Sequence, residues 1–161
     1  MRSALLFDLD ETLVVEEPAA VAAFEATARL ATDADPVALA PARTRARELW
    51  YATPVHGYSG RIGIASWEGL WCRFDGDDPE LRWLRDWAPE YRCEAWRLAL
   101  AEQGIDDVAL AARLGERSTA ERRARHEVFA DVIPALRRLR DGYTLGRSST
   151  RSPSSAATAR S

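Results

Sequence analysis

The sequence predicts an α/β protein in which a short strand near each end of the chain flanks a long helical block. The run Leu5–Phe7 is short and apolar and ends in carboxylates, which is typical of a buried strand that leads into a loop. A second strand is expected to begin at Tyr143, after a helix that ends at Gly142. Between these strands, from Val21 to Leu114, apolar residues recur at helical spacing.

Length and charge narrow the class of protein. At 161 residues, the chain is expected to be one domain, or one small domain with an insert. A net charge of -3 gives no reason to expect nucleic acid or an anionic membrane as a partner. We find no run near the ~20 apolar residues of a membrane span, and Asp8 ends the first apolar run too soon for a signal peptide. The oligomeric state cannot be predicted.

The chain contains arginine but no lysine, and it has two cysteines. All 22 basic residues are arginine, so these 161 residues contain no catalytic lysine. Cys72 and Cys93 are isolated cysteines, which we expect to be reduced and buried in a cytoplasmic protein.

The first half of the helical block is expected to contain helices separated by a loop. Glu16–Pro18 opens the first helix, because acidic residues and proline favour a helix N-terminus. The glycine-rich segment from Thr53 to Gly63 predicts a loop. The inward stripe of the first helix is expected at Val21, Phe24, Ala28 and Ala31, and further helical segments are expected to open at Asp35–Pro36, to run from Pro41 to Tyr51, and to run from Ile64 to Phe74.

Proline, glycine and capping residues predict the divisions of the second half. Asp78–Pro79 is expected to cap a helix that Pro89 divides. A helix from Asp106 is expected to stop at Gly115, and Ser118–Glu121 resembles a capping box that starts another helix. In the last part of the chain, Pro134 is expected to begin the helix that ends at Gly142, with Leu136 and Leu139 facing inward.

Two carboxylates at the end of the first strand are the main candidates for chemistry. If the extended backbone continues through Leu9, Asp8 and Asp10 lie on the same side. Carboxylates this close repel each other, so a divalent cation or a shared proton is the expected companion. One carboxylate can then act as a nucleophile while the other transfers protons. Thr12 is placed to hydrogen-bond the loop and fix Asp10. An EF-hand loop is excluded, because Leu13 and Ala19 occupy the positions of its glycine and glutamate.

The segment Phe7–Leu13 resembles the first motif, DxDxT, of the haloacid dehalogenase-like (HAD) hydrolase superfamily. The resemblance implies a Rossmann-like core and a phosphoaspartyl intermediate. It makes Asp8 the nucleophile and a Mg²⁺ ligand, and Asp10 the general acid/base with its backbone carbonyl on the metal. The dehalogenase branch lacks the second aspartate, so Asp10 favours a phosphatase or phosphotransferase.

The same resemblance implies a domain division. It assigns residues 1–15 and 128–149 to a partial HAD core, 16–127 to an all-helical cap, and 150–161 to a disordered tail. Phosphate binding is expected at Leu9, Asp10, Thr12 and Ser149.

The resemblance ends near Gly146. From Arg147 to Ser161, no residue larger than alanine is apolar, which is typical of disorder. The family's later lysine and acidic pair have no counterpart in this chain. We therefore expect a chain that is truncated or frame-shifted after about Gly146, with a minimal, partner-dependent fragment as the alternative.

Other candidates have ordinary structural explanations. The pairs Trp67/Trp71 and Trp83/Trp87 are four residues apart; they can wall a substrate pocket, but packing within a helical block is favoured. His56 is expected to be an exposed loop residue, and His126 to lie on a solvated face. Arg122, Arg123 and Arg125 can meet a phosphate, but such a charge run is usually solvated.

Two functions remain in competition at this stage. The first is a cytoplasmic, Mg²⁺-dependent phosphatase that acts on a small phosphorylated metabolite through an aspartyl phosphate. The second is a catalytically inactive HAD fragment with at most weak binding of metal or phosphate. The absence of lysine favours the second for this polypeptide.

Overall fold

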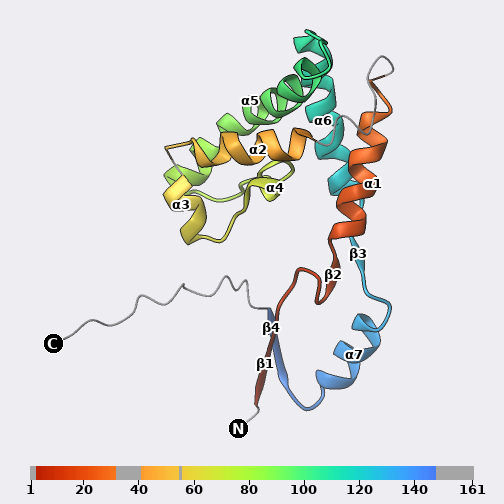
Figure 1. The fold of residues 1–161 in the computed structure, drawn as a ribbon. Coiled ribbons are helices and arrows are strands. Elements are labelled where there is room, and N and C mark those ends of the chain that lie inside the picture. The colour runs from red at the N-terminus through yellow and green to blue at the C-terminus, as the bar shows by residue number, and fades with distance from the viewer. Residues whose placement is uncertain (1–2, 32–40, 55, 148–161) are drawn as a thin grey trace, which may run out of the picture. The chain divides into compact units, whose positions relative to one another are not determined.

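The computed structural model describes residues 3–31, 41–54 and 56–147. The chain forms two compact units: a strand unit of Met1–Val15 with Val128–Ser161, and a helical unit of Glu16–Glu127 (Figure 1). The expected helical start at Asp35–Pro36, the candidate Ser149 and the expected tail lie outside the described residues. The helical unit begins at Glu16 and ends at Glu127. The assignment of the two units as HAD core and cap is a proposal.

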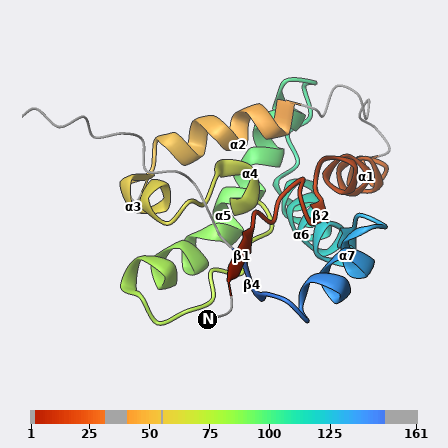
Figure 2. The ribbon, with the colours of Figure 1, turned by 90° about the horizontal axis from the view of Figure 1, so that it is seen from below.

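A parallel strand pair organises the strand unit. β1 (Ala4–Phe7) pairs with β4 (Thr144–Arg147) in the register Ala4↔Thr144 and Phe7↔Arg147, and the two strands lie side by side in both views (Figures 1 and 2). Parallel strands need a crossover, and the helix that leads back to β4 is α7 (Val132–Leu139). A second two-stranded sheet pairs β2 (Val14–Val15) with β3 (Glu127–Val128).

Two sequence predictions for this unit are off by a residue or two. α7 begins at Val132 rather than at Pro134, and β4 begins at Thr144 rather than at Tyr143. The N–H of Tyr143 donates to the carbonyl of Leu139 at 3.0 Å, so this residue still belongs to the turn that closes α7. Val132, rather than Leu136 or Leu139, is the buried residue of α7.

The helical unit packs around one long helix, α5. It spans Pro79–Ala101 and contacts both α2 (Pro41–Tyr51) and α6 (Val108–Ala124), while α6 also contacts α1 (Glu17–Ala28). The remaining helices are α3 (His56–Arg61) and α4 (Ser66–Gly69). Between β2 and β3, every element of the described residues is a helix.

Two apolar clusters form the core of the helical unit. One lies where α1, α5 and α6 meet and is built on Trp96, Leu100 and Leu114. The other lies between α2 and α5, where Trp50, Phe74 and Tyr91 are buried. In the second cluster the Tyr91 hydroxyl donates to the carbonyls of Ser66 (2.7 Å) and Ala46 (3.1 Å), and burial raises the pKa of this phenol above its usual value.

Tertiary packing overrides the helix breaks predicted from Pro89 and Gly115. α5 continues through Pro89, flanked by fully buried Leu84 and Leu100. α6 continues through Gly115 and through the expected capping box, because this glycine faces α5 at close range. A Cβ atom there would lie 3.2 Å from the backbone carbonyl carbon of Arg92. The glycine therefore permits a close helix–helix approach rather than ending a helix.

Other local predictions were also wrong. The loop expected from Thr53 to Gly63 contains helix α3, and the helix expected from Ile64 to Phe74 is only the four residues of α4. Val21 is exposed, because the buried stripe of α1 runs through Ala19, Ala23 and Thr27. The small residues of this stripe allow α1 to approach α6 closely.

The predicted cap at Asp78 is confirmed, since its carboxylate accepts from the N–H of Glu80 at 3.0 Å.

Gly69 provides a direct test of the packing in the second cluster. A Cβ atom on Gly69 would lie at or within 3.0 Å of three ring atoms of buried Trp50. We expect Gly69→Ala to lower the free energy of unfolding by about 1–3 kcal/mol, because the ring must move within a packed core. Urea denaturation measures this change.

The matched control is Gly60→Ala in α3, where an added Cβ has no neighbour within 4 Å. It is expected to leave stability unchanged or raise it by up to about 1 kcal/mol, because alanine favours a helix over glycine. Equal effects of the two substitutions would contradict the packing described for Gly69.

Candidate active-site loop

Asp8 directly follows the carboxyl end of β1. In open parallel sheets, ligands bind just beyond the carboxyl ends of the strands. Its side chain is exposed, and its Oδ1 accepts a hydrogen bond from the N–H of Leu9 at 2.9 Å. In the register of the sheet Phe7 lies opposite Arg147, so β1 and β4 end together. The strand pairing therefore presents the Asp8 carboxylate to solvent at the end of the sheet.

Backbone hydrogen bonds close the loop that carries Asp10. The N–H groups of Leu13 and Val14 both donate to the carbonyl of Leu9 at 2.9 Å, and the N–H of Glu11 donates to Val14 at 3.0 Å. Glu11 has a left-handed backbone (φ 52°), which makes this tight turn possible. Asp10 is exposed, and its backbone forms an isolated β-bridge with that of Val14. The loop thus holds Asp10 two residues beyond Asp8.

The structure describes two of the other predicted site residues, Thr12 and Leu9. Thr12 is exposed, and backbone hydrogen bonds close the loop in which it lies. Leu9, where phosphate binding was also expected, is half-buried, and its N–H donates to Asp8 Oδ1. Ser149 lies outside the described residues. Within the described part of the chain, no three His, Cys, Asp or Glu residues gather as a metal site.

The arginines near the end of α6 are not all solvated, contrary to expectation. Arg122 is only 4% exposed and forms an ion pair with buried Glu16. Its guanidinium also donates to the carbonyl of Arg125 at 3.0 Å and lies 4.8 Å from the ring centre of Trp71. In the structure Arg122 lies on the same face of α6 as buried Leu114 and Thr119, and no signal in the sequence separates it from the neighbouring arginines.

Arg123 and Arg92 hold the segment that follows α4. Arg123 donates to the carbonyls of Trp71 (2.7 Å) and Cys72 (3.2 Å), and Arg92 donates to Cys72 at 2.6 Å. Burial, with a smaller contribution from nearby Arg123, lowers the pKa of Arg92 to about 10. Both side chains therefore satisfy backbone carbonyls.

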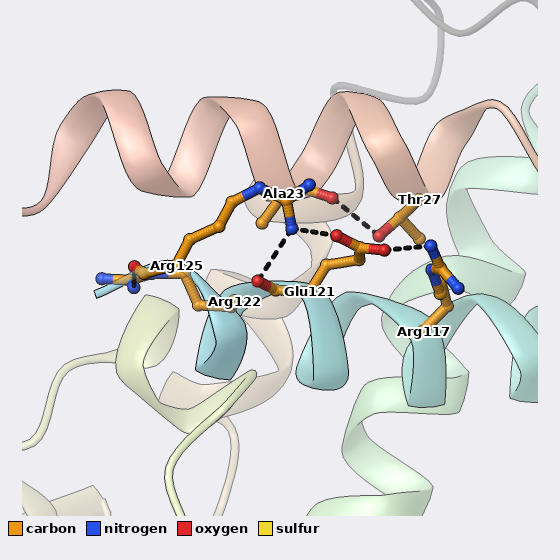
Figure 3. Close-up of polar contacts among 6 residues, drawn as sticks. All are labelled: Ala23, Thr27, Arg117, Glu121, Arg122 and Arg125. Atoms are coloured by element: carbon orange, nitrogen blue, oxygen red, sulfur yellow. Dashed lines mark hydrogen bonds and ion pairs between the residues drawn. The ribbon is translucent and has the colours of Figure 1, made fainter. Parts of the chain in front are cut away.

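A second ion-pair network is centred on Glu121 of α6, whose side chain is only 11% exposed. Glu121 forms ion pairs with Arg117 and Arg125, as Figure 3 shows, and Arg125 also donates to the Glu121 carbonyl at 3.0 Å. In α1, the Thr27 hydroxyl donates to the Ala23 carbonyl at 2.8 Å (Figure 3).

The two histidines and the Trp83/Trp87 pair all make contacts between rings. His56 was wrongly expected in an exposed loop; it is half-buried at the start of α3 and packs edge-on against Tyr51. His126 is exposed, as expected, and packs edge-on against Trp71. Trp87 packs against the second apolar cluster and stacks on Trp83 with ring centres 5.4 Å apart, whereas Trp83 itself is 39% exposed.

Trp67 and Trp71 instead line a small cavity within the helical unit. The cavity has a volume of about 50 Å³ and is lined by residues of α1, α2, α4 and α6 and of the segment after α4. Its lining is mostly apolar, with two charged side chains. The lining residues are Ala20, Ala23, Phe24, Arg43, Trp67, Leu70, Trp71, Ser118 and Arg122.

Comparison with known proteins gives one partial similarity. A stretch of 100 residues, 62% of this chain, is 34% identical to phosphoserine phosphatase from Thermus thermophilus. The matched stretch spans only 39% of that protein's length. No family model matches the chain, and no solved structure matches it. The chain is thus distantly similar to part of a phosphatase. None of the helices in the described residues has the length and apolar character needed to cross a membrane.

Arg122 and Glu16 allow a test of the buried ion pair. We expect Arg122→Met to lower the free energy of unfolding by about 3–5 kcal/mol, because it leaves the Glu16 carboxylate buried without its charge partner. Chemical denaturation of the purified chain provides the measurement.

The matched control is Arg29→Met, which removes the partner of Glu25 from an exposed pair on α1. That change is expected to cost less than about 1 kcal/mol. A loss for Arg122→Met no larger than for Arg29→Met would show that Glu16 is solvated.

Proposed function

We propose that the chain carries the nucleophile loop of a HAD-like, Mg²⁺-dependent phosphatase that acts on a small phosphorylated metabolite. One observation carries the proposal: Asp8 directly follows the end of a parallel strand, and a tight loop holds Asp10 two residues beyond it. The similarity to part of phosphoserine phosphatase supports a phosphatase over other hydrolases. The helical unit would be the cap of such an enzyme.

The proposed reaction uses the two aspartates in turn. The Asp8 carboxylate attacks phosphorus, a P–O bond to Asp8 forms, and the P–O bond to the leaving group breaks. Asp10 gives its proton to the leaving alkoxide. Asp10 then takes a proton from the water that attacks the aspartyl phosphate, which releases inorganic phosphate and restores Asp8. The exposure of both side chains gives substrate and water access to them.

The donor atoms of the loop are compatible with Mg²⁺. This ion prefers oxygen ligands and is often held by one or two carboxylates together with water and substrate phosphate. The Asp8 carboxylate and the Asp10 backbone carbonyl would hold it. When bound, Mg²⁺ would offset the repulsion between carboxylate and phosphate.

The second candidate is an inactive chain that binds metal or phosphate weakly. Composition favours it, because no lysine is present among the 161 residues to stabilise charge on the transferring phosphoryl group. Removal of one preorganised charge-stabilising group typically slows a reaction by about 10²–10³-fold. The two candidates differ in turnover and share the metal-binding loop.

Hydrolysis by the purified chain tests the reaction. We expect Mg²⁺-dependent phosphate release from a panel of monoesters that includes phosphoserine, at a rate far below the usual ~1–10³ s⁻¹ of enzymes. Asp8→Asn is expected to abolish it, because the amide cannot form the aspartyl phosphate.

The matched control is Asp86→Asn, an exposed aspartate on α5. It is expected to leave the rate unchanged. Activity that survives in Asp8→Asn would remove Asp8 from the mechanism, and turnover within the usual range would show that no lysine is needed.

Metal binding tests the loop independently of turnover. Mn²⁺, a spectroscopic substitute for Mg²⁺, is expected to bind the chain weakly, and Asp8→Asn is expected to weaken binding further because a charged ligand is lost. Electron paramagnetic resonance of free Mn²⁺ measures this, with Asp86→Asn again as the control. Equal binding by all three proteins would place the metal elsewhere.

A further inference from the structure

A pocket of about 350 Å³ lies where the last turn of α6 meets the segment after α4. Two arginines line it, Arg73 and Arg123, together with His126 and one acidic residue, Asp75. Among the described residues, no carboxylate forms an ion pair with either arginine. The pocket therefore differs from the end of α6 around Arg122 and Arg125, where the arginines are paired with glutamates.

Both arginines of the pocket have donors to spare. Arg123 is held in place by its Nε and Nη2, which donate to the carbonyls of Trp71 (2.7 Å) and Cys72 (3.2 Å). Its Nη1 makes no hydrogen bond with the described residues and is not buried. Arg73 is exposed, and its side chain makes no hydrogen bond within the described part of the chain. The pocket thus offers one fixed guanidinium and one adaptable guanidinium.

Positive charge gathers around this pocket. Arg92 lies beside Arg123, because both donate to the carbonyl of Cys72. Burial and then the charge of Arg73 lower the pKa of Arg123, so the two pocket arginines are close enough to repel each other. Asp75 is the one carboxylate among the described lining residues. Three guanidiniums against one carboxylate leave an excess of positive charge, which a bound anion would relieve.

The donors and the charge favour phosphate over a carboxylate. A guanidinium binds carboxylate or phosphate oxygens in pairs, but phosphate has more oxygens and can accept from two arginines together. A phosphate dianion also matches the charge excess better than a monoanion does. The volume lies within the range of about 300–1,000 Å³ that is typical of small-molecule pockets, so it leaves room for an organic group beside Trp71.

We propose that this pocket is a binding site for a phosphate group, whose oxygens accept hydrogen bonds from Arg123 Nη1 and from the Arg73 guanidinium. All the described lining residues belong to the helical unit, and the proposal does not depend on the phosphatase chemistry of Asp8. It rests on two arginines without carboxylate partners that line one pocket and carry unused donors.

The experiment titrates inorganic phosphate into the ¹⁵N-labelled chain at constant ionic strength, with EDTA to remove divalent metals. NMR follows the indole N–H signal of Trp71, identified by its loss in Trp71→Phe. We expect this signal to move in a saturable manner at millimolar phosphate and to show no saturable shift with acetate. An equal response to acetate would overturn the ligand class, and no saturable shift with phosphate would overturn the site.

The Asp8→Asn chain separates this pocket from the candidate active-site loop. It is expected to bind inorganic phosphate as well as the parent chain does, and loss of binding would place the phosphate at Asp8 and overturn the proposal. In the same variant, phenyl phosphate distinguishes an ester from free phosphate without turnover at Asp8. Tighter binding than inorganic phosphate would support the site as one for phosphate esters, and weaker binding would support it as one for free phosphate.

Two substitutions in the pocket are expected to act in opposite directions. Arg73→Gln removes a charged donor, so we expect phosphate to bind about tenfold more weakly. Asp75→Asn removes the charge that repels phosphate, so we expect binding several-fold tighter than in the parent chain. Weaker binding in both variants would indicate damage to the fold and would contradict the proposal.

The matched control is Arg113→Gln, which removes an exposed arginine of α6 that is not among the described lining residues. It changes the net charge as Arg73→Gln does and is expected to leave phosphate binding unchanged. Equal losses in Arg73→Gln and Arg113→Gln would show that phosphate responds to the net charge of the chain, which would overturn the site.

Discussion

The parallel pairing of β1 with β4 is the constraint on which the candidate site depends. It joins residues 4–7 to residues 144–147, so nearly the whole chain lies between two strands that touch. A parallel pair cannot be closed by a hairpin, and the intervening chain must return to the same end of the sheet. The helical unit is accommodated within this connection. The pairing also fixes where β1 ends, and with it the position of Asp8.

The helical unit is held together by α5, and its stability comes from packing rather than from local helix signals. Pro89 and Gly115 oppose a helix locally, yet both lie inside helices that pack against each other. Gly115 brings α6 against the backbone of Arg92, and the Arg92 side chain in turn satisfies the carbonyl of Cys72. Close approach and buried hydrogen bonding are thus coupled at one contact between α5 and α6.

Buried charge is concentrated where α1 begins and α6 ends. Glu16 precedes α1, and Arg122 lies in the last turn of α6, so their ion pair ties together the two ends of the helical unit's chain. Arg122 also contacts Trp71, which connects this pair to the segment after α4. Along the chain, β2 comes directly before Glu16 and β3 follows a few residues after Arg122.

The sequence by itself determined the strand that ends just before Asp8, the two-aspartate loop and the helical character of the long middle segment. It did not determine the burial of this strand, since Leu6 is 71% exposed. These features are local: an apolar run that stops at carboxylates and apolar residues at helical spacing need no distant partner to be recognised. The cap at Asp78 was predictable for the same reason, since a capping side chain bonds to its own helix.

Only the tertiary structure decided which local signals are overridden and which charged groups are buried. Continuous α5 and α6 follow from burial on their neighbours, which exceeds the cost of a proline or glycine within the helix. Arg122 resembles its half-buried neighbours Arg123 and Arg125 in sequence, and it is fully buried where Glu16, 106 residues away, supplies the opposite charge. Pairing over such a distance leaves no local pattern, so the ion pair and the cavity beside Trp71 became visible only once the helices were packed.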